Sequence, residues 1–67
     1  MKEKFLELKS KPCADLYVLH IKAKSGEEIF IYMHNASVSK DGSFLVLKGC
    51  YRNFSFDEIT EMELTTD

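Results

Sequence analysis

The stretch EEIFIYMHNASV, residues 27–38, decides how the rest of the chain is interpreted. Successive side chains of a β-strand point to opposite faces, so a strand here presents two faces of different composition. The odd-numbered side chains are aliphatic: Ile29, Ile31 and Met33. The even-numbered side chains are aromatic: Phe30, Tyr32 and His34. The aliphatic face can line a core. The aromatic face then needs a second covering, because large exposed apolar patches mark interaction sites.

The length of the chain predicts one domain spanning residues 1–67. A chain of this size buries only about 60% of the surface that its unfolded form exposes. Its composition, 45% hydrophobic and 30% charged, is typical of a folded globular domain. A single core at this length supplies roughly 3–5 kcal/mol of net stability. We therefore expect that oligomerisation or a bound partner contributes to stability.

The formal net charge of −2 argues against sequence-independent nucleic-acid binding, which needs a basic excess. The charge is unevenly distributed along the chain. Residues 1–24 carry a balance of +3, and residues 53–67 carry a balance of −5. Such polarity can orient a partner or a head-to-tail neighbour. The alternative is that the two segments are solvated ends of opposite sign.

No stretch of the sequence reaches the ~20 apolar residues that a transmembrane helix requires. The first twelve residues also lack the apolar run of a secretory signal peptide. We therefore predict a cytoplasmic protein without membrane contact. In that compartment Cys13 and Cys50 are expected to be reduced, small and partly buried. A disulfide between them is the alternative.

The pattern along the chain predicts a short helix followed by five strands. Residues 2–9 place apolar side chains at helical spacing, and Pro12 prevents the helix from continuing. Two turns of helix are too short to be stable alone, so this helix must pack on something. The strands are predicted at residues 16–24, 28–38, 44–49, 51–56 and 60–66, with a tight turn at 57–59.

The predicted turns fix the pairing of the strands. A three-residue turn at 25–27 gives the pairs Val18–His34, Leu19–Met33, His20–Tyr32, Ile21–Ile31 and Lys22–Phe30. Asp41 and Gly42 form a type I′ hairpin signal, which pairs Val38 with Leu45 and Ala36 with Leu47. The inward positions are odd-numbered up to Met33 and even-numbered from Ala36. We therefore predict a bulge or sharp bend near His34 and Asn35.

This layout resembles a Sm-like or, more broadly, an SH3-like small barrel. The shared features are the N-terminal helix, five strands, a long bent second strand and a tight turn before the last strand. Gly26 lies where a Sm-type loop glycine would. The stretch IFIYMH lacks the second glycine, Leu45 lies near the position of the base-binding asparagine, and SFDEI has acids in place of a lysine–histidine pair. The resemblance implies a five-stranded barrel and RNA binding.

The sequence predicts no enzymatic activity. His20, Tyr32 and His34 share one face, where acid–base chemistry would need a partner. We expect no acid on that face to orient either histidine ring, and no serine or cysteine nucleophile beside them. A zinc site is not predicted, because the cysteines and histidines lack the close spacing of ligand pairs. The three glycines are scattered turn residues and form no Gly-rich phosphate loop, and neither a metal nor another cofactor is expected.

An excess of apolar side chains points away from the predicted core: Val18, Phe30, Tyr32, Phe44 and Val46. Three coverings are considered. The N-terminal helix can cover this face through Phe5 and Leu8. A second subunit or another protein can do so. Single-stranded nucleic acid can stack there, assisted by lysines and Arg52.

We therefore predict a mainly β, five-stranded SH3-like barrel that acts as a non-enzymatic protein-binding module. It would associate with itself or regulate or inhibit a larger complex. The alternative is a Sm-like protein that binds RNA or another single-stranded nucleic acid. The candidate partner-binding residues are Val18, His20, Phe30, Tyr32, His34, Tyr51 and Arg52.

Overall fold

The computed structural model describes residues 1–49 and 52–65, which form a mainly β domain with a short N-terminal helix. The helix α1 spans Lys2–Lys9, as predicted. Three single-turn 3₁₀ helices lie between the other elements: η1 (Ala14–Leu16), η2 (Met33–Asn35) and η3 (Phe56–Glu58). The strands are β1 (Val18–Ala23), β2 (Glu28–Tyr32), β3 (Ala36–Val38), β4 (Phe44–Leu47), β5 (Arg52–Ser55) and β6 (Ile59–Thr65).

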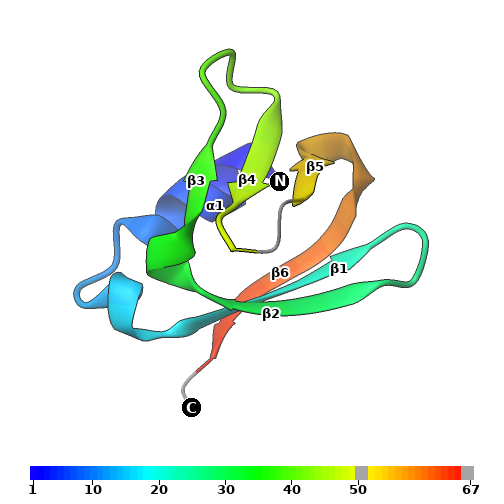
Figure 1. Ribbon diagram of the computed structural model, residues 1–67. Helices are drawn as coiled ribbons and strands as arrows, with labels where there is room; N and C mark the ends of the chain where they lie inside the picture. The colour runs from blue at the N-terminus through cyan, green and yellow to red at the C-terminus, as the bar shows by residue number, and fades with distance from the viewer. Residues whose placement is uncertain (50–51, 66–67) are drawn as a thin grey trace.

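The six strands form two three-stranded antiparallel sheets, in the orders β2-β1-β6 and β3-β4-β5 (Figure 1). The predicted closed five-stranded barrel is therefore wrong. The chain passes from one sheet to the other through η2 and again through η3, and at each point a helical turn interrupts the strand ladder. The first interruption divides the predicted long second strand into β2 and β3. Among the described residues, no backbone ladder joins the two sheets into a barrel.

The predicted change of parity occurs at η2, although through a helical turn rather than a bulge. Side chains three residues apart are eclipsed in a 3₁₀ helix. Met33 and Ala36 are therefore both directed into the core, where they are 0% and 1% exposed. The ammonium group of Lys9 donates to the backbone carbonyl oxygens of Met33 and Ala36, at 2.9 Å and 3.0 Å. It also forms an ion pair with Asp15. The end of α1 is thereby attached to the bend.

The β1–β2 register differs by two residues from the predicted one. His20 lies opposite Phe30, and Val18 lies opposite Tyr32. The hairpin loop ends at Gly26 rather than at Glu27, because Gly26 has a positive φ of 92° and closes the turn by bonding back to Ala23. A shift of two residues leaves every side chain on its predicted face. The division into aliphatic and aromatic faces therefore remains.

The β3–β4 pairs are those predicted, Ala36 with Leu47 and Val38 with Leu45. The turn itself is longer, since Ser39 and Phe44 still bond and four residues, 40–43, form the loop. It is not a type I′ turn, because only Gly42 within it has a positive φ. The Asp41 carboxylate accepts hydrogen bonds from the Ser39 hydroxyl and the Ser43 amide, and these bonds lower the pKa of Asp41.

β6 pairs with β1 along its length and contains a register shift opposite Lys22 and Ala23. Thr60 is the extra residue there, and its hydroxyl donates to the Lys22 carbonyl. Ile59 and Met62 consequently both face inward, although their numbers differ in parity. The first residues predicted as a turn at 57–59 form η3, whereas Ile59 already belongs to β6.

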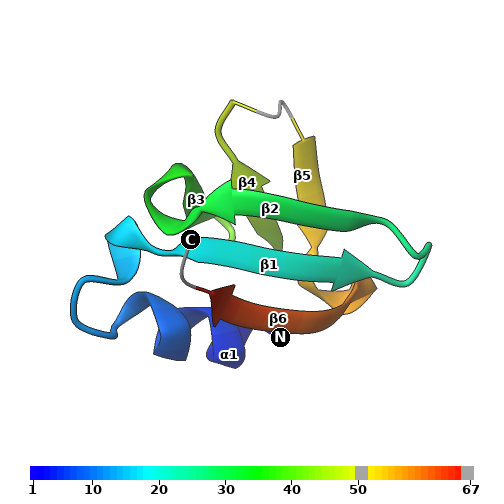
Figure 2. The ribbon, with the colours of Figure 1, turned by 90° about the horizontal axis from the view of Figure 1, so that it is seen from below.

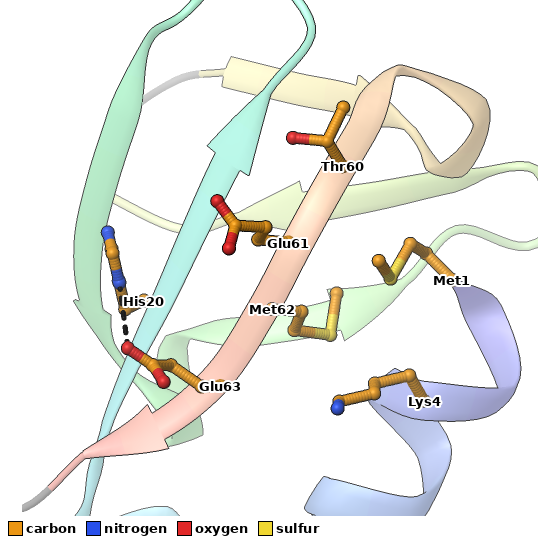
Figure 3. A pocket seen from close by; sticks show the side chains of 7 residues that line it. All are labelled: Met1, Lys4, His20, Thr60, Glu61, Met62 and Glu63. Carbon is orange, nitrogen blue, oxygen red and sulfur yellow. Dashed lines mark hydrogen bonds and ion pairs between the residues drawn. The ribbon is translucent and has the colours of Figure 1, made fainter.

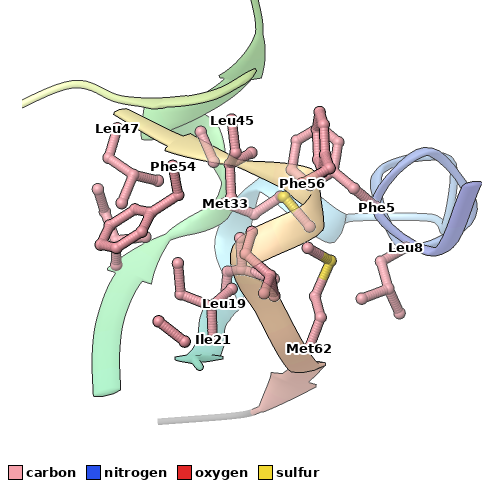
Figure 4. Close-up of a cluster of buried hydrophobic side chains, with 14 of the residues drawn as sticks. Phe5, Leu8, Leu19, Ile21, Met33, Leu45, Leu47, Phe54, Phe56 and Met62 are labelled. Atoms are coloured by element: carbon pink, nitrogen blue, oxygen red, sulfur yellow. The ribbon is translucent and has the colours of Figure 1, made fainter. Parts of the chain in front are cut away.

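The core lies between the two sheets, and α1 closes its open end (Figure 4). Phe5 and Leu8 are the buried side chains of the helix, and the Phe5 ring lies 6.2 Å from the Phe56 ring. The helix packs against β6 and η1. The most completely buried large side chains come from both sheets, from η2 and from the helix: Phe5, Leu19, Ile21, Met33, Leu45 and Leu47.

Candidate functional site

The side of sheet β2-β1-β6 that points away from the core forms a continuous surface, here called the outer face. Figure 2 looks onto this sheet, with α1 lying beyond the edge formed by β6 and β3–β5 lying behind. The register arranges its side chains in three cross-strand rows. From the hairpin end these rows are Glu61–Lys22–Glu28, Glu63–His20–Phe30 and Thr65–Val18–Tyr32.

Phe30 and Tyr32 are exposed on the outer face, with 64% and 45% of their surfaces accessible. The hypothesis that the N-terminal helix covers them is wrong. The buried side chains of the helix, Phe5 and Leu8, pack in the core on the opposite side of the sheet. The prediction that these aromatic residues point away from the core is confirmed.

His20 is held in the middle of the outer face by three neighbours. Its ring stacks on the Phe30 ring, with centroids 4.3 Å apart and planes 2° apart. Nδ1 lies 3.2 Å from Oε1 of Glu63, and Nε2 lies 3.0 Å from Oε1 of Glu28. The expectation that no acid orients this histidine is therefore wrong. The turn signals of the sequence do not predict the β1–β6 pairing that brings Glu63 to His20. The alternation of Glu61 and Glu63 does indicate that both acids share one face of β6.

The two carboxylates favour the charged form of His20. A neutral imidazole can donate from only one nitrogen, whereas the imidazolium can donate to both carboxylates at once. The hydrogen bond to Glu63 is the largest influence and raises the pKa of His20 above its usual value of 6.5. Partial burial opposes this shift, and the hydrogen bond and charge of Glu28 reinforce it. The two contacts therefore favour the protonated, cationic form of the planar ring between the two acids.

The outer face has an acidic excess. Lys22 lies 3.6 Å from Glu61, so three carboxylates face one lysine and the His20 ring. These contacts also show how the uneven charge of the sequence is arranged. Lys22 of the basic segment lies on β1 beside Glu61 of the acidic segment on β6, so the two segments meet at this ion pair.

Tyr32 and His34 extend the aromatic surface toward η2. Their rings lie 5.7 Å apart with planes at 24°. The His34 Nδ1 lies 3.3 Å from the Asp15 carbonyl oxygen, which links η2 to η1. Val18 lies opposite Tyr32 and is partly buried. Five of the seven candidate residues thus form one cluster on β1, β2 and η2: Val18, His20, Phe30, Tyr32 and His34.

The structure does not join Arg52 to this cluster. Arg52 begins β5 in the second sheet, where its guanidinium forms a two-point ion pair with Glu27 and lies 4.8 Å from the centre of the Phe54 ring. This pair connects Glu27, the residue before β2, with the second sheet. Tyr51, the other candidate from this segment, lies outside the described residues, as does Cys50.

A shallow hollow of about 330 Å³ adjoins the outer face at the edge formed by β6 (Figure 3). His20, Glu61 and Glu63 lie on one side of β6, whereas Met1, Lys4 and Met62 lie on the other. The hollow therefore lies between Glu61 and Glu63 on the outer face and the first residues of the chain, Met1 and Lys4.

Within the described part of the chain, no group of three or more metal-ligating side chains comes together. Cys13 is exposed rather than partly buried, because it lies in the connection after Pro12 with a left-handed φ of 60°. No helix formed by the described residues is long and apolar enough to cross a membrane. Comparisons with protein-family models, curated proteins and solved structures give no match.

Proposed function

We propose that this protein is a small non-enzymatic binding module whose outer face contacts another protein. The observation that supports this function is the exposure of Phe30, 64%, beside Tyr32 on a face that α1 leaves uncovered. Aromatic side chains are enriched at the centres of protein interfaces. In this fold they contribute little to the core, which is built from the opposite face of the same strands.

Charge favours a different protein over a second copy as the partner. Two outer faces placed against each other would bring the carboxylates of Glu28, Glu61 and Glu63 in both copies together, and juxtaposed like charges disfavour a complex. The face is also small. Three strands ~4.8 Å apart and about five residues long have a projected area of roughly 240 Å². A stable interface buries about 800 Å² on each partner. The charge, rather than the area, therefore favours regulation or inhibition of a larger complex over self-association.

Photo-crosslinking tests the proposal. Benzoylphenylalanine is introduced in place of Phe30 and, in a control protein, in place of Phe44, which is 41% exposed in the second sheet. Both proteins are irradiated in an extract of the native cells. We expect a discrete protease-sensitive adduct from position 30 and none from position 44. Absence of a position-30 adduct, or identical adducts from both positions, would contradict the proposal.

A second candidate function is Sm-like binding of single-stranded nucleic acid. It is supported by the bend at η2 between β2 and β3, although the two sheets form no closed barrel among the described residues. Aromatic platforms can stack bases, whereas the acidic outer face repels phosphates. RNA binding that weakens with salt and is lost in Tyr32→Ala would favour this candidate over protein binding.

A further inference from the structure

We propose that the outer face recognises an extended partner segment through arginine, with a guanidinium group stacked on Phe30 and paired with Glu28. This inference rests on the protein-binding function proposed above and specifies the chemistry of the partner. It is supported by three features of the face: the contacts that it already makes with a planar cation, the carboxylate oxygens that remain available, and the spacing along β2.

The face already holds one planar ring whose protonated form is a cation, and this ring belongs to the protein itself. The His20 ring lies on Phe30 and directs a nitrogen to each of Glu28 and Glu63. A guanidinium group shares these properties with a protonated imidazole ring. It is planar, stacks on aromatic rings and donates hydrogen bonds in its plane to carboxylates. The surroundings of His20 thus show that this combination of a ring and two acids holds such a cation.

The acids retain capacity for a second cation. Each carboxylate uses its Oε1 atom for His20, and neither Oε2 atom makes a hydrogen bond within the described part of the chain. The Glu28 and Glu63 side chains are 49% and 64% exposed. His20 covers only one side of the Phe30 ring. The exposed surface of Phe30 is therefore accessible to a guanidinium group, and Oε2 of Glu28 is available to pair with one.

The spacing along β2 suits an extended ligand. Glu28, Phe30 and Tyr32 are alternate residues of one strand, so their side chains follow one another at about 7 Å. Alternate side chains of an extended peptide have the same spacing. Arginines at every second position can thus reach successive positions on the face. The small area of the face also suits a short segment rather than a second folded domain.

The net charge distinguishes this ligand from nucleic acid. The three carboxylates outnumber Lys22 and the protonated His20 ring by one negative charge, which attracts a basic segment and repels a phosphate backbone. Lysine would be attracted by the same charges, but an ammonium group lacks the planar shape that stacks and bonds in two directions. The face should therefore prefer arginine over lysine by a measurable factor.

A titration with three matched peptides tests this inference. The probe is a heptapeptide of serines with arginine at its second, fourth and sixth positions, and the controls replace arginine by lysine or by neutral citrulline. Binding is followed by NMR shifts of backbone amides. We expect the arginine peptide to shift amides of β1 and β2. We expect the lysine peptide to bind about threefold more weakly, and the citrulline peptide at least about tenfold more weakly.

Charge-matched variants locate the contact. Glu28→Gln and Glu61→Gln remove the same charge from the same face, but only Glu28 adjoins Phe30. We expect about fivefold weaker binding for Glu28→Gln and less than about twofold for Glu61→Gln. Phe30→Ala should weaken binding about threefold, whereas Phe44→Ala should leave it unchanged. Equal effects of the two glutamate variants would overturn the proposed pairing.

Failure of the arginine inference is distinguishable from failure of the proposed function. No shifts with the arginine peptide, or equal binding of the citrulline peptide, would overturn the inference, while a position-30 crosslink would still support protein binding. Conversely, absence of that crosslink counts against protein binding whatever the peptide does. Tighter binding of a labelled single-stranded RNA than of the arginine peptide, lost in Phe30→Ala, would replace both with nucleic-acid recognition.

Discussion

The His20 and Phe30 rings lie 4.3 Å apart with their planes only 2° from parallel, and each nitrogen of His20 faces a carboxylate. This arrangement connects the three strands of the first sheet on their exposed side, since Glu28 and Phe30 belong to β2 and Glu63 belongs to β6. It also leaves the remaining surface of Phe30 exposed. The same cluster therefore contributes to the fold and presents the surface that we assign to partner binding.

The contacts of His20 with Glu28 and Glu63 predict that the free energy of unfolding of the wild-type protein depends on pH. The His20→Gln variant should lack this dependence. Because the folded pKa of His20 is raised above 6.5, its contribution is fully present below that pH and is lost as the pH rises through the folded pKa. Urea unfolding between about pH 6 and 8.5 should show a decline in wild-type stability relative to the variant. The lowered pKa of Asp41 acts only at acidic pH, outside this interval. Parallel profiles would contradict the assigned contacts.

Substitution of Lys9, which lies far from the outer face, is expected to lower the stability of the fold. Its ammonium group donates to the Met33 and Ala36 carbonyls and pairs with Asp15. Lys9→Met should lower the free energy of unfolding by about 1–3 kcal/mol, because hydrogen bonds to charged groups are lost at the bend. Lys11→Met is the matched control, with an expected change under about 0.5 kcal/mol. Equal effects in chemical denaturation would show that the attachment of α1 to η2 is unimportant.

The outer face should tolerate loss of its aromatic side chains. Phe30→Ser combined with Tyr32→Ser is expected to change the free energy of unfolding by less than about 1 kcal/mol per site, the range of strand propensities. Leu19→Ala, which truncates a fully buried side chain, should cost about 2–5 kcal/mol. Thermal and urea unfolding of the three proteins provide the comparison. Unfolding of the double variant would place these aromatic residues in the core.

The isolated protein should be a monomer of 7.7 kDa in solution. The acidic outer face disfavours pairing of two copies through this surface. Light scattering during gel filtration measures the mass directly. A hexamer or heptamer would contradict this expectation and would favour the Sm-like candidate function.

The local features of this fold could be predicted from sequence. Residues 2–9 form a helix because their apolar spacing and Pro12 are local signals, and the β3–β4 pairs follow from Asp41 and Gly42. The position of the bend followed from parity. The β1–β2 register required the conformation of Gly26, which the sequence pattern alone leaves undetermined. The separation of the strands into two sheets and the approach of Glu63 to His20 depend on contacts between distant segments. Local sequence patterns do not encode such contacts.

The most direct test of partner binding through the outer face is a calorimetric titration of the protein captured by crosslinking at position 30. Wild-type protein, the folded Phe30→Ser/Tyr32→Ser variant and Phe44→Ser are titrated under the same conditions. The account predicts that the double variant binds at least about tenfold more weakly, while Phe44→Ser stays within about twofold of wild type. Equal affinities for wild type and the double variant would contradict it.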